Sequence, residues 1–137
     1  MKTIITSICF SLLSLYIHAQ DTKIKIVFDV TSANTKVHQA AVRHVKGMSA
    51  AYPDAQFEVV MYGGAMDMVI KGKSSVANDI ETLAKQDNID FVICQGTMKR
   101  HNTKESDLVS GVKQVPDGIL ELVSKQNKGW GYIKESQ

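Results

Sequence analysis

Segments with strand character and segments with helical character alternate along this chain, and that alternation constrains the fold more than any other feature of the sequence. Runs rich in β-branched and aromatic residues predict five strands: Ile24–Thr31, Phe57–Tyr62, Ile89–Cys94, Val112–Val115 and Trp130–Ile133. Strands that alternate with helices form parallel sheets whose two faces are both covered by helices. The sequence therefore predicts an α/β protein with three layers, α/β/α, around a five-stranded and mainly parallel sheet.

Apolar residues at helical spacing define the helices that connect these strands. The first helix is predicted to run from near Val37 to Tyr52, where Pro53 ends it. The last helix begins near Pro116, which suits a first helical turn, and Asp117 is favourable at the positive end of the helix. In that last helix we expect three apolar side chains to face the core: Ile119, Leu122 and Val123.

Residues 1–19 are predicted to be a secretory signal peptide. Lys2 gives a positively charged start, residues 4–17 are mostly apolar, and Ala19 is a small residue at the predicted cleavage point. The apolar run is short for a membrane span. We therefore expect a mature chain, residues 20–137, that forms a single domain, is periplasmic or secreted, and makes no membrane contact after cleavage.

The mature chain is nearly neutral and keeps one thiol. The whole chain has 16 basic and 14 acidic residues, and loss of Lys2 leaves 15 against 14, a formal charge of +1. That balance does not favour binding to nucleic acid or to an acidic membrane. Cleavage also removes Cys9, so an internal disulfide cannot form. The remaining Cys94 is therefore buried, reactive, or paired with another chain.

Cys94 lies at the predicted position of a functional site in this fold. Ligands of parallel α/β sheets collect at the carboxyl ends of the strands, and Cys94 ends the predicted central strand. Gly96 permits a tight turn there, and Thr97 can cap the segment that follows. Free backbone N–H groups, with Lys99 and Arg100 close in sequence, favour thiolate over thiol. The alternative is that Cys94 is a small core residue.

Three further residues are candidates for a site near Cys94. Asp29 falls near the end of an otherwise apolar strand, where it either caps the next loop or places a polar group beside the thiol. Gly63 opens a strand-to-helix turn, for which turn geometry alone is an alternative explanation. His101 follows Cys94 closely, but a thiol and one imidazole fall short of a zinc site. No nucleotide-binding fingerprint is present, so we expect neither a metal nor an organic cofactor.

Four segments together resemble the DsrE/DsrF-like family, over about residues 23–134 and in the same order: Val27–Thr31, Phe91–Arg100, Val115–Ile119 and Gly129–Ile133. The resemblance implies a compact α/β/α fold around a five-stranded parallel sheet, similar in layout to flavodoxin. It also implies assembly as trimers or hexamers. Characterised intracellular members carry sulfur as a cysteine persulfide, on a cysteine that Cys94 matches.

The resemblance and the residues together predict an exported protein that carries or transfers sulfur through Cys94. The thiolate would attack a sulfane donor, with Gly96 and Thr97 N–H groups stabilising the anion and Lys99 or Arg100 adding positive charge. Further contacts to a small sulfur-containing or anionic ligand are expected from Asp29, Gly63 and His101. The alternative is an oligomeric, non-enzymatic module that holds a small anion in the same crevice.

Overall fold

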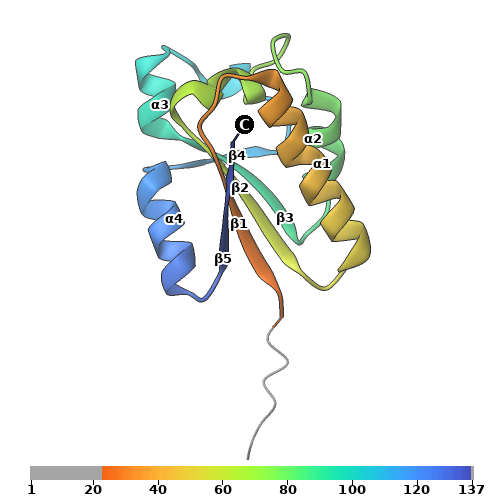
Figure 1. Cartoon of the computed structure of the whole chain (residues 1–137). Coiled ribbons are helices and arrows are strands. Elements are labelled where there is room, and N and C mark those ends of the chain that lie inside the picture. Colours follow the sequence, from red (N-terminus) through yellow and green to blue (C-terminus); the bar gives the residue numbers. More distant parts are fainter. Residues whose placement is uncertain (1–22, 137) are drawn as a thin grey trace, which may run out of the picture.

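The computed structural model describes residues 23–136, and the predicted signal peptide lies outside this part of the chain (Figure 1). Five strands are present: β1 (Lys25–Val30), β2 (Gln56–Met61), β3 (Ile89–Cys94), β4 (Val112–Val115) and β5 (Gly131–Glu135). The helices are α1 (Thr35–Ala51), α2 (Ala77–Leu83), α3 (Gln95–Arg100) and α4 (Gly118–Asn127), with short 3-10 segments η1 (Gly63–Val69) and η2 (Glu105–Asp107). In the described residues no helix is long and apolar enough to cross a bilayer.

All five strands form one sheet in the order β4-β3-β2-β1-β5, and each pair of neighbours is parallel. The predicted α/β fold with a five-stranded sheet is confirmed, and the sheet is parallel throughout. Figure 1 shows α1 and α2 on one side of the sheet and α3 and α4 on the other. The chain steps from β1 to β4 in one direction, and α4 then carries it back to the other side of β1.

The main core lies between the sheet and the layer formed by α1, η1 and α2. Strand side chains alternate between the two faces, so Phe28, Phe57 and Phe91 fall together on this face and are fully buried. Val37 and Val45 pack onto them from α1. Burial of each such aromatic side chain contributes roughly 1.5–3 kcal/mol. This face of the sheet holds most of the apolar stabilisation of the fold.

The opposite face is covered more sparsely, because α4 is the one helix that crosses its centre. Its buried apolar cluster is small and consists of Val27, Val60, Val92 and Leu122. The expectation that Ile119 and Val123 face the core is wrong, since their exposed fractions are 58% and 46%. A single helix contacts a sheet along a narrow stripe, and only Leu122 of the three lies on that stripe.

A buried ion pair joins α4 to the sheet beneath it. Glu58 of β2 is only 3% exposed, and its Oε2 lies 2.5 Å from Nζ of Lys125. The Lys125 ammonium also lies 4.4 Å from the centre of the Trp130 ring, whereas Oε1 of Glu58 has no hydrogen-bond partner among the described residues. Burial raises the pKa of Glu58 to about 7, although the Lys125 ammonium acts in the opposite direction. This carboxyl therefore titrates near neutral pH.

Several strand ends differ by one or two residues from the sequence-based expectation. Strand β5 extends beyond Ile133, because Lys134 pairs with Asp29 of β1 and the next residue continues the ladder. The longer β5 matters for the site, since it brings Lys134 to the carboxyl end of the sheet.

Candidate functional site

Polar side chains from four adjacent strands meet on the α4 side of the sheet, at the carboxyl ends of the strands. Cys94 ends β3, and Tyr62 follows β2 at the level of Cys94, because Met61 pairs with Ile93. Asp29 and Lys134 pair across β1 and β5. This is the edge at which parallel α/β sheets bind ligands.

The thiol of Cys94 lies in a setting that favours its ionised form. The residue is only 8% exposed, and burial by itself raises its pKa. Backbone N–H groups of Gly118, Thr97 and Gly96, together with the Thr97 hydroxyl, outweigh burial and bring the pKa of Cys94 below its ordinary value. The side chain makes no cap hydrogen bond of standard geometry in α3, so these groups act by directing their dipoles at charge on the sulfur.

The Thr97 hydroxyl is arranged so that its proton is left for the sulfur. Its Oγ1 accepts one hydrogen bond from the Gly63 N–H and one from Nη2 of Arg100, both at 3.0 Å. A hydroxyl has two acceptor lone pairs and one donor proton, so both acceptor positions are filled. Thr97 is fully buried, and its hydroxyl is among the groups that lower the pKa of Cys94. Gly63 and Arg100 thus influence Cys94 through Thr97.

Gly118 allows α4 to begin directly against the thiol. A Cβ atom added to Gly118 would lie 3.3 Å from Cβ of Cys94 and 3.2 Å from the Tyr62 ring. The Asp117 carboxylate caps the helix and accepts from the N–H groups of Ile119 and Leu120 at 2.8 and 3.0 Å. The Gly118 N–H has the largest effect among the groups that lower the pKa of Cys94. The positive, N-terminal end of the α4 dipole therefore lies beside Cys94 and stabilises its thiolate.

The structure separates the remaining predicted site residues into two groups. Gly96, Thr97, Gly63 and Arg100 cluster around Cys94, as described above. The expected direct effect of the two cations is not what lowers the pKa of the thiol, because the groups responsible are N–H dipoles and a hydroxyl. Lys99 and His101 are exposed, with His101 at the C-terminal cap of α3.

Asp29 is the centre of a second polar group beside the thiol. Its Oδ2 accepts from the Tyr132 hydroxyl at 2.6 Å, and its Oδ1 accepts from Nζ of Lys134 at 3.0 Å. Lys134 also donates to Oγ1 of Thr31 at 2.7 Å and lies 5.9 Å from the centre of the Tyr62 ring. Burial, the charge and hydrogen bond of Asp29, and then the charge of Cys94 raise the pKa of Tyr62. Tyr62 therefore stays protonated between the two groups.

Four residues of this site were not recognised from the sequence: Tyr62, Gly118, Tyr132 and Lys134. Gly118 could have been found, because it begins a helix at the end of the strand predicted to follow Cys94. The contribution of β5 had no local signal, since its place beside β1 depends on strand order.

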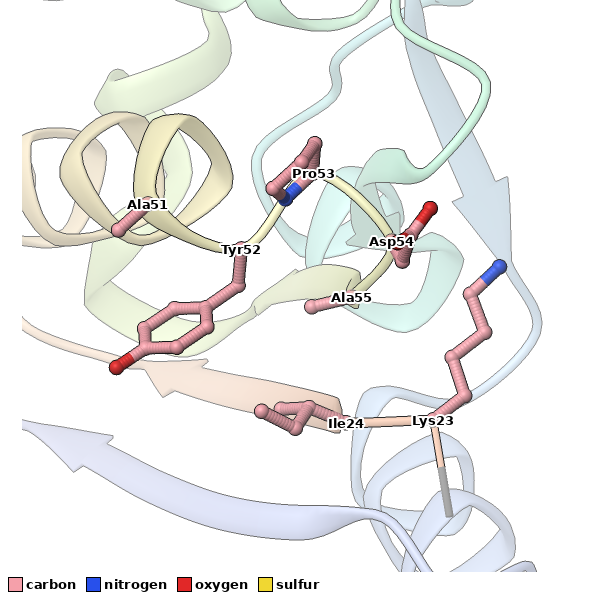
Figure 2. A pocket seen from close by; sticks show the side chains of 7 residues that line it. All are labelled: Lys23, Ile24, Ala51, Tyr52, Pro53, Asp54 and Ala55. Carbon is pink, nitrogen blue, oxygen red and sulfur yellow. The ribbon is translucent and has the colours of Figure 1, made fainter. Parts of the chain in front are cut away.

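The cavity shown in Figure 2, about 580 Å³ in volume, lies at the other end of the sheet. Its lining includes Ile24, Tyr52 and Pro53, which precede the starts of β1 and β2. A six-residue strand is about 20 Å long, so this cavity is remote from Cys94. The described residues contain no group of three or more His, Cys, Asp or Glu side chains placed to hold a metal ion.

The fold and the site together define an α/β protein whose described residues hold one thiol, at the carboxyl edge of a parallel sheet and beside the start of a helix. The chain belongs to the DsrE/DsrF-like family, which it matches over residues 15–134. That family is associated in general with sulfur relay. No curated protein matches the sequence significantly.

Three solved structures illustrate the fold that this chain shares. A protein of unknown function, MTH1491 from Methanobacterium thermoautotrophicum, is 24% identical with a TM-score of 0.76, over 82% of this chain and 99% of that one. The ychN protein from E. coli is 14% identical with a TM-score of 0.67, over 82% and 97%. A conserved protein of unknown function, BT1422 from Bacteroides thetaiotaomicron, is 13% identical with a TM-score of 0.63, over 80% and 93%. At these identities the likeness establishes the fold.

Replacing Thr97 by valine is expected to raise the pH at which Cys94 becomes reactive. The hydroxyl is lost at nearly constant volume, and a hydrogen bond to a charged group is worth enough to shift the midpoint by roughly one pH unit. The measurement is the alkylation rate of native protein by iodoacetamide against pH. Thr97→Ser keeps the hydroxyl and should retain the wild-type midpoint. Equal midpoints in the valine and serine variants would show that the hydroxyl does not act on the sulfur.

Proposed function

We propose that this protein carries sulfur as a persulfide on Cys94, within the sulfur chemistry associated with its family. The observation that carries the proposal is the arrangement of Gly118, Thr97 and Gly96 around the thiol, which lowers its pKa in spite of its burial. A core cysteine has no need of three N–H dipoles and a hydroxyl directed at its sulfur. Lowered thiol pKa values are typical of nucleophilic cysteines.

The reaction proceeds by displacement at sulfur. The Cys94 thiolate attacks the sulfane sulfur of a donor, so that a new S–S bond forms on Cys94. The S–S bond of the donor breaks, and its electron pair leaves with the remainder of the donor. An acceptor thiolate then attacks the outer sulfur, and Cys94 departs as the regenerated thiolate. The same N–H groups stabilise the anion at both stages.

The proposal is tested by measuring the intact mass of residues 20–137 after exposure to a sulfane donor, with and without reductant. Uptake of sulfur that reductant removes is the expected result. An unchanged mass, in protein whose Cys94 can still be alkylated, would exclude persulfide formation and favour a second candidate function. That candidate is a module that binds a small anion without chemistry, and the dipoles around Cys94 favour it because they also suit an anion.

We further propose that the chain self-associates through the outer face of α4. Four apolar side chains are exposed on or beside this helix, with exposed fractions between 43% and 66%: Ile119, Leu120, Val123 and Tyr132. The helix covers a sheet face with little apolar core of its own, and exposed apolar patches of this kind mark interaction surfaces. Trimers or hexamers are the assemblies proposed, by likeness to the family.

Leu120→Asp is expected to convert the assembly into a monomer. Leu120 is 66% exposed, and burial of a leucine contributes roughly 1.5–3 kcal/mol per copy, which a charged side chain would reverse. Sedimentation at micromolar concentration gives the mass of each species. Thr82→Asp adds the same charge on the exposed side of α2 and should leave the assembly intact. A monomeric wild-type protein would contradict self-association.

Export is also proposed, from the signal-peptide pattern of residues 1–19. Mature protein recovered from the periplasm or the medium should begin at Gln20. N-terminal sequencing that finds the full-length chain would remove this proposal.

A further inference from the structure

We propose that Lys134 forms an anion-binding subsite beside Cys94, and that this subsite selects small sulfane donors bearing an oxyanion, of the thiosulfate class. The inference rests on the proposed function, because it names the kind of donor that the same site takes. Two observations support it: the position of the Lys134 ammonium group relative to the Cys94 thiol, and the hydrogen bonds that fix this ammonium group.

Lys134 is held by contacts that leave part of its ammonium group available. Two of its three N–H donors are used, one by Asp29 at 3.0 Å and one by Thr31 at 2.7 Å. Its side chain is 37% exposed, whereas that of Asp29 is 5% exposed. The carboxylate is also occupied by the Tyr132 hydroxyl. A ligand arriving from solvent therefore meets the cation, and the carboxylate serves to fix its position.

Tyr62 lies between this cation and the thiol. Its ring lies 5.9 Å from Nζ of Lys134, and it packs with Cys94 around Gly118. By register, Cys94 on β3 and Thr31 beyond β1 lie two strand spacings apart, which is about 10 Å. Because Lys134 donates to Thr31, the ammonium and the thiol lie at the two ends of this backbone span.

That separation sets the length of the donor. An attack distance of about 3.5 Å, a donor S–S bond of about 2 Å and a charge-assisted hydrogen bond of about 2.8 Å span most of it. One S–O bond completes the distance. A thiosulfate-type donor therefore fits with its sulfane sulfur at Cys94 and an oxyanion oxygen at Lys134.

The step balances for thiosulfate itself. The Cys94 thiolate attacks the sulfane sulfur, the new S–S bond forms on Cys94, and the donor S–S bond breaks. Sulfite leaves with that electron pair, and Cys94 keeps an ionised persulfide. Charge is conserved, since one thiolate and a dianion become one persulfide anion and a dianion. Lys134 stabilises the leaving sulfite, where negative charge accumulates.

Paired alkylating reagents test the subsite without any sulfur chemistry. Iodoacetate and iodoacetamide are close in size, but only iodoacetate is an anion. The ratio of the iodoacetate rate to the iodoacetamide rate on Cys94 therefore reports attraction of an anion to the site. The ratio in native protein should exceed that of the same chain in denaturant. Lys134→Gln should lower it about two- to fivefold, as expected for loss of one partly solvated charge contact.

Two variants make the result specific. Lys134→Arg keeps the charge and should keep most of the ratio. Lys128→Gln removes the same charge from an exposed position at the far end of α4 and should leave the ratio unchanged. Thermal unfolding of each variant checks that the fold is retained.

Failure of the subsite can be told apart from failure of the proposed function. Equal ratios in wild type and Lys134→Gln, or a native Cys94 that neither reagent reaches, would overturn the subsite. A Lys134-dependent ratio with no persulfide formed would support the subsite and overturn sulfur transfer. When both hold, Lys134→Gln should raise the thiosulfate concentration needed for half-maximal persulfide formation by a similar factor.

Discussion

Residues 20–137 with the substitution Cys94→Ser are expected to take up no sulfur from any sulfane donor, whereas the wild-type chain gains sulfur that reductant removes. Cys94 is the one thiol in this segment, and a serine hydroxyl is far too weak an acid to supply a comparable nucleophile at neutral pH. The close contacts of Gly118 are with Cβ of residue 94, which serine keeps. The fold should therefore survive the change, and a urea unfolding curve provides that control.

The outcome of this experiment also separates the two candidate functions. Sulfur uptake by Cys94→Ser would refute the persulfide mechanism. Retained binding of a small anion by the serine variant, with no sulfur uptake by wild type, would favour the binding module. A wild-type thiol that reacts with iodoacetamide only in denaturant would identify Cys94 as an inert core residue.

Wild-type protein is expected to lose stability as the pH rises from about 4.5 to about 7, more steeply than Glu58→Gln. Burial raises the pKa of Glu58 from 4.5 to about 7, so the folded state holds a proton that the unfolded state has released over this range. Stability falls with pH wherever the folded state binds more protons. The stabilisation is fully present below 4.5 and lost above about 7, by an amount on the order of 1–3 kcal/mol.

Free energies of unfolding in urea at pH 5 and pH 8 measure this effect. The loss between the two pH values should be larger in wild type than in Glu58→Gln, because other titrating groups are common to both. Asp90→Asn is the matched control, since Asp90 lies on the same face of the sheet but is 39% exposed. Identical pH dependence in wild type and Glu58→Gln would mean that the Lys125 ammonium keeps Glu58 ionised throughout.

The strands and the thiol were the parts of this molecule that the sequence could define. Strand β3 begins and ends where the apolar run predicts, since Phe91 to Cys94 suit a strand covered on both faces. The sequence did not predict correctly which side chains of α4 are buried. Helical spacing indicates a stripe but not its width, and Ile119 and Val123 fall outside the contact that one helix makes with the sheet.

The surroundings of Cys94 were predicted only in part, for a physical reason. Gly96 and Thr97 follow Cys94 directly, so their N–H groups are local to it. Lys99 is equally local in sequence, but its side chain lies on the exposed side of α3. Gly118 and Lys134 come from elements whose places depend on the order of strands in the sheet. No local pattern encodes that order, because it follows from packing of the whole chain.

The place of β5 beside β1 makes the site depend on a strand that is distant from it in sequence. Lys134 reaches Asp29 across 105 positions of sequence, and Tyr132 across 103. Until the ribosome has synthesised β5, Asp29 has neither of these partners and the edge of β1 that β5 covers is open. Products of premature termination, or of proteolysis ahead of Gly131, therefore keep the thiol and lose the charged side of its crevice. The charged side of the site thus depends on a strand that lies about a hundred positions after the aspartate that it contacts.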